Sequence, residues 1–194
     1  MTERIAVFET KAPLAETLAP AVRALQQGAL VIFPTETVYG IAARADKPEA
    51  VEKIYTAKRR PERKPLSQHV GDWTTLGILI GEVPQQVRVI LRKYLPGPYT
   101  FLISVRGEKL GVRFPEDIVA QTFLAACRVP VVATSANISG EPSPVNAEMT
   151  ASVAAHAAYV IDAGPTSFQS DSTVVDLTKM PPECVRQGAG EWKG

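Results

Sequence analysis

A run of polar residues follows directly after a short apolar segment near the start of the chain. The apolar segment is residues 29–33, and residues 34–40 read Pro-Thr-Glu-Thr-Val-Tyr-Gly. Open α/β sheets bind ligands at the carboxyl ends of their strands, so two hydroxyls and a carboxylate at this point suit a small polar molecule. Threonine and tyrosine also favour strands, so an ordinary strand-to-loop transition remains the alternative.

A second segment concentrates positive charge. Between residues 58 and 64 the chain carries five cations, namely Lys58, Arg59, Arg60, Arg63 and Lys64. Arginine forks and a lysine point charge are the groups that bind a polyphosphate. A solvated surface loop or a contact with tRNA would use the same residues.

A third segment, residues 130–142, places hydroxyls and an amide after another buried strand. Thr134, Ser135 and Asn137 follow this strand closely. Small polar side chains and exposed N–H groups can form an anion-binding nest. The same residue types cap helices and make turns without any ligand, and that alternative stays open.

Three single residues complete the candidate set. Arg113 stands in an apolar strand, where a buried guanidinium needs an acidic partner or an anionic ligand. An edge strand that faces water is the other explanation. Ser172 and Arg186 lie at the ends of later predicted strands. Neither a GxxxxGK(S/T) phosphate loop nor a GxGxxG motif occurs in the chain, so a nucleotide would be held without a glycine-rich cradle.

The elements that must position these residues alternate between helices and strands. Helices are predicted at residues 20–27, 46–58, 83–94, 117–127 and 146–158. The first extends upstream to about Leu14 only if Pro20 is tolerated inside it. Strands are predicted at residues 29–33, 99–105, 110–113, 129–133, 159–161, 173–177 and 184–187. The alternation predicts an α/β fold, and connections too short for parallel crossovers predict a mixed parallel and antiparallel sheet flanked by helices.

Composition narrows the class of protein. The chain has 194 residues, of which 45% are hydrophobic, so we expect one globular domain over residues 1–194. A net charge of +1 gives no whole-molecule case for nucleic acid or a membrane, and no apolar run reaches the roughly 20 residues of a membrane helix. Two cysteines outside any paired motif, two histidines and no signal pattern at the start favour a cytoplasmic location without a zinc site.

Eight motifs, in this order, resemble those of the YrdC family of threonylcarbamoyl-AMP synthases, also called TsaC. They lie at residues 34–40, 58–61, 65–66, 96–100, 112–115, 135–140, 172–176 and 186–188, so the resemblance covers roughly residues 14 to 190. The resemblance implies a YrdC-like fold, a twisted mixed sheet flanked by helices with a concave, positively lined face. It also implies a nucleotidyltransferase that forms threonylcarbamoyl-adenylate and pyrophosphate from ATP, L-threonine and bicarbonate or CO₂.

The resemblance assigns a nucleotide site and the catalytic residues. The family's Lys-x-Arg and Ser-x-Asn set, expected to be catalytic and to line the nucleotide and phosphate site, corresponds to Lys58, Arg60, Ser135 and Asn137. Arg186 is expected near the nucleotide. No strong general base is visible in the motifs, so catalysis would depend on positioning and on Mg²⁺ held largely by the phosphates of ATP, with no metal site on the protein.

The resemblance also assigns a threonine pocket. Thr35, Ser67 and Ser172 are expected in it, and Arg113 is expected to pair with the threonine carboxylate. Lys64 stands where the family commonly has asparagine, and Ser67 stands where an aliphatic residue is usual. These departures leave the exact contacts of Ser67 open.

The implied partners are tRNA and the machinery that transfers the threonylcarbamoyl group to an adenosine beside the anticodon. The chain resembles the short, single-domain form of the family. One alternative function is a tRNA-binding, double-stranded RNA-binding or ribosome-maturation module that uses the same basic face. Another is the carbamoyl-transfer domain of hydrogenase-maturation proteins, which normally accompanies cysteine pairs that are absent here.

Overall fold

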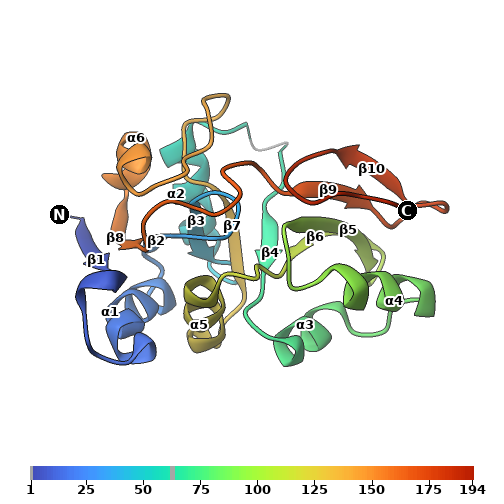
Figure 1. Ribbon diagram of the computed structural model, residues 1–194, viewed down its shortest axis with the longest axis horizontal. Helices are drawn as coiled ribbons and strands as arrows, with labels where there is room; N and C mark the ends of the chain where they lie inside the picture. The colour runs from blue at the N-terminus through green and yellow to red at the C-terminus, as the bar shows by residue number, and fades with distance from the viewer. Residues whose placement is uncertain (1, 62–63) are drawn as a thin grey trace.

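The computed structural model describes residues 2–61 and 64–194, and its main feature is a twisted sheet between helices (Figure 1). Within the described residues, ten strands form one sheet in the order β1-β8-β2-β3-β7-β4-β6-β5-β9-β10. The strands are β1 (Glu3–Ala6), β2 (Leu30–Phe33), β3 (Gly40–Arg44), β4 (Ser67–His69), β5 (Tyr99–Val105), β6 (Glu108–Arg113), β7 (Val131–Ser135), β8 (Ala157–Asp162), β9 (Thr173–Asp176) and β10 (Glu183–Arg186).

The strand directions are mixed, as predicted from the short connections. The pairs β1–β8, β8–β2, β4–β6 and β5–β9 are parallel, and the other neighbouring pairs are antiparallel. Strands β5 and β6 form a hairpin through Arg106 and Gly107, whose φ angles are +52° and +85°. Positive φ at both central residues is the requirement of a tight hairpin turn that matches the strand twist. The predicted mixed α/β sheet is confirmed.

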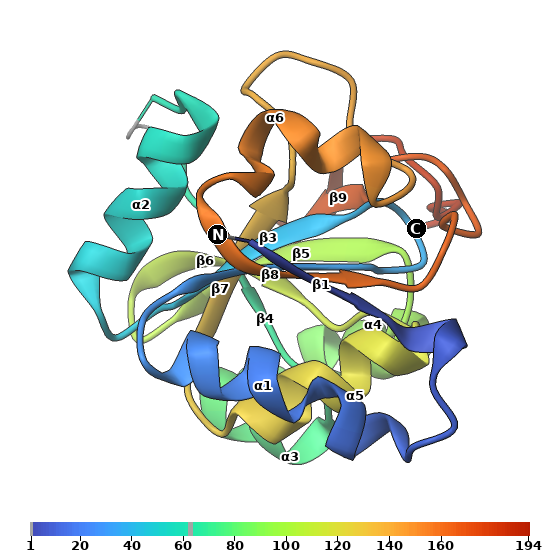
Figure 2. The same ribbon diagram turned by 90° about the vertical axis from the view of Figure 1, so that its left-hand side faces the viewer.

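The helices form a layer on each side of the strands. They are α1 (Leu14–Gln26), α2 (Pro48–Lys58), α3 (Trp73–Ile80), α4 (Gln85–Tyr94), α5 (Ile118–Cys127) and α6 (Ala151–Ala154), with short 3-10 helices η1 (Val7–Glu9) and η2 (Glu148–Thr150). In both views α1, α3, α4 and α5 lie below the strands, and α2 and α6 lie above them (Figures 1 and 2). Every helix of the described chain is too short or too polar to cross a membrane.

Three apolar clusters hold the helices against the sheet. One joins α1 and α5 to the sheet through Leu25 and Phe33, and a second packs α2 on it through Ile54. The third packs α3 and α4 on β5, β6 and β9, with Leu91 and Phe101 in its centre. Full burial of one such side chain stabilises the fold by about 1.5–3 kcal/mol. These clusters fix the strands whose ends carry the polar candidates.

Most of the predicted elements are confirmed, with ends that differ by a few residues. Helix α1 begins at Leu14, so the upstream extension across Pro20 is present. Pro20 removes the hydrogen bond to the carbonyl of Glu16, but Glu16 is exposed and its oxygen can bind water. Burial of Leu18 and Leu25 on one face stabilises the helix despite that loss.

The helix predicted at residues 146–158 is wrong. That segment contains only η2 and the four-residue α6, and β8 already begins at Ala157. Ala157 pairs with Leu30 of β2, so hydrogen bonds inside the sheet override the helix preference of alanine. The sequence patterns also gave no prediction of β1, β3, β4 and α3.

Candidate functional site

A cavity of about 440 Å³ lies over the centre of the sheet and brings most of the candidate residues together. Seven of the nine residues named from the sequence line it: Thr35, Arg60, Ser67, Arg113, Ser135, Ser172 and Arg186. The other two, Lys58 and Asn137, are buried beside it. Arg63, from the cation-rich segment, lies outside the described residues, as does Glu62. The roles that the sequence analysis gave to individual residues stay predictions.

The cavity exists because the strands present small residues on one face. Residues of β5 and β6 alternate, so Phe101 packs under α4 while Gly111 faces the cavity. Gly111 pairs with Ser67, which pairs in turn with Ala133 of β7. A Cβ atom at Gly111 would lie 3.0 Å from Ser67 Oγ. Glycine, serine and alanine on neighbouring strands therefore leave a hollow floor.

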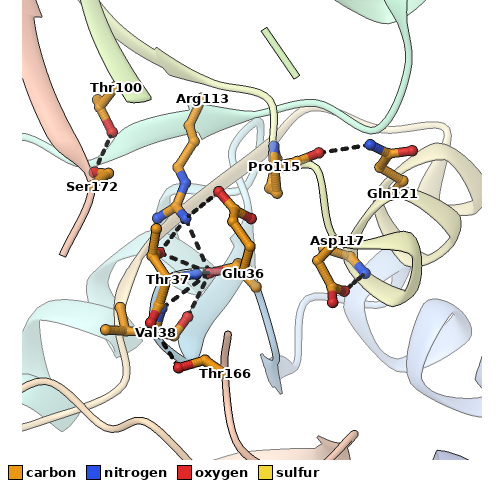
Figure 3. A network of polar contacts seen from close by, with 12 residues as sticks. Glu36, Thr37, Val38, Thr100, Arg113, Pro115, Asp117, Gln121, Thr166 and Ser172 are labelled. Carbon is orange, nitrogen blue, oxygen red and sulfur yellow. Dashed lines mark hydrogen bonds and ion pairs between the residues drawn. The ribbon is translucent and has the colours of Figure 1, made fainter. Parts of the chain in front are cut away.

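Arg113 lies at the end of β6 and connects this floor to the loop after β2 (Figure 3). Its Nη2 atom donates to Thr35 Oγ1 at 3.0 Å, to Glu36 Oε1 at 3.2 Å and to Thr37 Oγ1. Arg113 is 7% exposed and Glu36 is 3% exposed. The acidic partner that a buried arginine in this strand requires is therefore Glu36.

The loop itself is folded by its own hydroxyls. Thr35 Oγ1 donates to the carbonyl of Val38 at 2.7 Å and accepts from the N–H groups of Thr37 and Val38 at 3.2 and 3.3 Å. The carbonyl of Thr37 accepts from Thr166 Oγ1 at 2.8 Å. A threonine that bonds to the backbone of its own turn stabilises that turn without a helix or strand. The loop thus holds its polar groups in fixed positions at the cavity wall.

Lys58, the last residue of α2, closes a second loop beside the cavity. Its Nζ atom donates to the carbonyl of Ser135, to the carbonyl of Asn137 at 2.5 Å and to Asn137 Oδ1 at 3.3 Å. Asn137 Nδ2 in turn donates to the carbonyl of Glu141 at 2.6 Å. Burial, together with the nearby charge of Arg60, lowers the pKa of Lys58 to about 8. Lys58 and Asn137 therefore fix the backbone that carries Ser135.

The charged side chains that line the cavity are mostly basic. They are Arg60, Lys109, Arg113, Arg186 and one carboxylate, Asp171. Lys109, Arg113 and Arg186 each lie within 4 Å of a carboxylate. Arg60 instead donates to main-chain carbonyls of residues 64 and 65 at 3.1 and 3.0 Å, and burial lowers its pKa. The cavity is positively lined, and the wider basic face stays a prediction.

Thr100, Ser172 and Arg186 form a hydrogen-bonded cluster in the lining of the cavity. Ser172 Oγ lies 2.8 Å from Thr100 Oγ1, the residue that pairs with Arg113 across β5 and β6 (Figure 3). Arg186 donates to the carbonyl of Ser172 through Nη2 at 2.8 Å and through Nε at 3.1 Å. The predicted residues Ser172 and Arg186 are therefore neighbours, although they are 14 positions apart in the sequence.

His69 is a cavity residue that was not among the site residues predicted from the sequence. It lies two residues after Ser67 on β4, so both side chains point to the same face of the sheet. Burial and the neighbouring charge of Arg113 lower the pKa of His69 to about 3, so its ring is neutral. The i, i+2 spacing from Ser67 would have identified His69 if the three-residue strand had been predicted.

No protein metal centre is evident in the described part of the chain, because no group of three or more His, Cys, Asp or Glu side chains is placed to hold an ion. Asp171 is the carboxylate in the cavity lining. Its carboxylate accepts from Ser143 Oγ at 2.9 Å and lies 3.6 Å from Arg186 Nη1. A divalent cation in this cavity would need most of its ligands from its own substrate or from water.

Comparison with known proteins gives a consistent result. Residues 23–188 match the Sua5/YciO/YrdC family model, which is described as "Telomere recombination". A threonylcarbamoyl-AMP synthase of Pyrococcus abyssi is 36% identical over 175 residues, which are 84% of this chain and 52% of that protein. A threonylcarbamoyl-AMP synthase of Bacillus subtilis is 34% identical over 183 residues, which are 88% of this chain and 53% of that protein.

A solved structure matches as well. The crystal structure of P. abyssi Sua5 complexed with L-threonine superposes with a TM-score of 0.87 at 32% identity, over 97% of this chain and 57% of that chain. The chain thus spans about half the length of the relatives named here.

Proposed function

The chain belongs to the Sua5/YciO/YrdC family, and we propose that it forms threonylcarbamoyl-adenylate and pyrophosphate from ATP, L-threonine and bicarbonate. The observation that carries the proposal is one cavity whose lining combines the buried Arg113 and nearby hydroxyls with Arg60, a cation that bonds to main-chain carbonyls within the described residues. Its volume of about 440 Å³ is typical of small-molecule sites, which span about 300–1,000 Å³. The names of the P. abyssi and B. subtilis relatives support the same activity.

The threonine end of the cavity is formed by Arg113, Thr100 and Ser172. Arg113 supplies a guanidinium for the α-carboxylate, and the paired hydroxyls can exchange hydrogen bonds with the threonine hydroxyl. The P. abyssi Sua5 structure complexed with L-threonine, which matches 97% of this chain, supports a threonine site in this fold.

The nucleotide end is formed by Arg60 and the loop that carries Ser135. Arg60 lines the cavity and bonds only to main-chain carbonyls within the described residues, so its charge is not neutralised there. Lys58 likewise donates to carbonyl and amide oxygens rather than to a carboxylate. Cations that lack an acidic partner attract phosphates most strongly.

The reaction requires two bond-forming steps. The amine of threonine adds to the carbon of bicarbonate with loss of water, which gives a carbamate. A carbamate oxygen then attacks the α-phosphorus of ATP, the bond to the bridging oxygen breaks, and pyrophosphate leaves with those electrons. Negative charge grows on the transferred group and on the leaving group, so fixed cations and N–H donors there lower the barrier.

Mg²⁺ enters this proposal with ATP. This cation would take most of its ligands from the triphosphate and from water. The protein's contribution is then to orient the carbamate and the α-phosphate in line and to exclude water from the cavity. The product would pass, in the cytoplasm, to the machinery that modifies tRNA beside the anticodon.

Product analysis tests the proposal. The protein is incubated with ATP, Mg²⁺ and threonine in either ordinary or ¹³C-labelled bicarbonate, and the products are separated and weighed. The proposal predicts threonylcarbamoyl-adenylate that becomes heavier with the labelled bicarbonate. Folded protein that yields no adenylate but binds tRNA in a salt-sensitive manner would instead favour the RNA-binding function.

A further inference from the structure

We propose that Glu36 is a positioning residue, whose carboxylate holds Arg113 by one nitrogen and so directs another nitrogen of the same guanidinium toward the substrate carboxylate. The inference rests on the proposed function, because threonine is the substrate whose carboxylate would reach Arg113. It adds a role for Glu36, which the sequence analysis treated only as part of a polar loop.

Glu36 cannot act on the substrate directly in this arrangement. Its side chain is 3% exposed and is absent from the residues that line the cavity, whereas Arg113 lines it. Glu36 Oε1 lies 3.2 Å from Arg113 Nη2, so the carboxylate contacts the guanidinium directly (Figure 3). Any effect of Glu36 on a ligand must therefore pass through Arg113.

All the hydrogen bonds from the Arg113 side chain to described residues are donated by one nitrogen, Nη2. Nη2 contacts Thr35, Glu36 and Thr37, three consecutive residues of one loop. Nε is buried without a partner, and so is Glu36 Oε2. The pair is therefore one-sided rather than the two-bonded fork that arginine and a carboxylate usually form. Nη1, which bonds to no described residue, is the nitrogen left for a carboxylate in the cavity.

Hydrogen bonds to the loop hold the backbone of Glu36 in place. Its main-chain carbonyl accepts from the N–H of Phe168 at 2.8 Å, and the next carbonyl, that of Thr37, accepts from Thr166 Oγ1 at 2.8 Å. Backbone anchored at Glu36 and at the next residue limits how far the carboxylate can follow the guanidinium. A fixed counter-charge also keeps Arg113 from being a buried, unpaired cation while the cavity is empty.

Steady-state kinetics of two Glu36 variants tests the inference. Glu36→Ala removes both the charge and the acceptor, and Glu36→Gln keeps the acceptor and the shape. We expect the KM for threonine to rise by at least about tenfold in Glu36→Ala, the effect of losing one hydrogen bond to a charged group, and by less in Glu36→Gln. The kcat at saturating threonine and the KM for ATP should stay within about twofold of the wild type.

The matched control is Glu116→Ala. Glu116 is a largely exposed carboxylate whose pKa is raised by partial burial and by the charge of Glu36, so it is a nearby acidic side chain. It makes no hydrogen bond or ion pair with Arg113 within the described residues. We expect unchanged kinetic constants for Glu116→Ala.

The outcomes separate the two hypotheses. If the wild type makes no adenylate, the proposed function is wrong, whatever the variants show. If the wild type is active and folded Glu36→Ala has an unchanged KM for threonine, the role of Glu36 is overturned. A common fall in kcat and in both affinities would indicate a structural role and would also overturn it. If Glu36→Ala does not fold, Glu36→Gln carries the test: it removes the charge and must raise the KM for threonine alone, and an unchanged KM overturns the role of Glu36.

Discussion

Deprotonation of Lys58 is predicted to weaken the binding of MgATP as the pH rises through about 8. The Lys58 side chain is 1% exposed, and burial together with the charge of Arg60 lowers its pKa from 10.5 to about 8. Only the protonated amine attracts phosphates. The affinity for MgATP is therefore highest well below pH 8 and declines above it, where the neutral amine predominates in the free protein.

The size of the effect follows from the titration. If the protein with a neutral Lys58 does not bind the nucleotide, the apparent dissociation constant doubles at the pKa and rises about tenfold one pH unit above it, which corresponds to about 1.4 kcal/mol. Calorimetric titration of a non-hydrolysable ATP analogue with Mg²⁺, from about pH 7 to about pH 9.5, measures this. Lys58→Arg is the control, because its guanidinium stays charged over the whole range.

Two results would refute this reasoning. A flat affinity profile for the wild type would mean that Lys58 does not titrate near pH 8 or does not contribute its charge to nucleotide binding. An equal decline in Lys58→Arg would assign the pH dependence to another group.

Three substitutions test the geometry of the cavity. Arg113→Lys keeps the charge but loses the planar fork, so the KM for threonine should rise by at least about tenfold in steady-state assays. Gly111→Val fills the cavity floor, since even its Cβ would lie 3.0 Å from Ser67 Oγ, so calorimetry should detect no threonine binding while the melting temperature is retained. Gly188→Ala would place a Cβ 2.2 Å from the carbonyl oxygen of Asp171, so urea unfolding should show a loss of about 1–3 kcal/mol.

Each of these has a clear contrary result. Wild-type kinetic constants in Arg113→Lys would show that threonine binding does not depend on the planar guanidinium. Threonine binding by Gly111→Val would place the amino acid away from the floor. Gly77→Ala is the control for Gly188→Ala, because a Cβ at Gly77 would meet nothing within 4 Å and alanine favours a helix. Equal stability changes in the two glycine variants would contradict the predicted clash.

The elements with strong periodic signals could be predicted from the sequence, and those held by their neighbours could not. Strand β5 and helix α2 combine regular apolar spacing with clear stops, and both were predicted closely. Strand β3 contains Gly40, Ala42 and Ala43, residue types that disfavour strands, and it exists because β2 and β7 pair with it on both sides. Such pairing depends on distant segments and leaves no local pattern.

The residues that line the cavity could be predicted from the sequence better than the hydrogen bonds that they make. Motif residues such as Arg113 and Ser172 do line one cavity, because strand ends collect polar groups at the same edge of the sheet. The pairing of Arg113 with Glu36 and the main-chain acceptors of Lys58 depend on loop geometry, which the motifs do not encode. His69 was missed because a three-residue strand has no periodicity to detect.

The most direct test of the proposed activity is pyrophosphate release from MgATP by the purified wild-type protein, with threonine and bicarbonate each present or omitted. The proposal predicts release that requires both co-substrates, because the carbamate that attacks the α-phosphorus contains atoms of each. Release that continues without threonine, or without bicarbonate in CO₂-free buffer, would contradict carbamate attack, and no release under any condition from folded protein would contradict the activity itself.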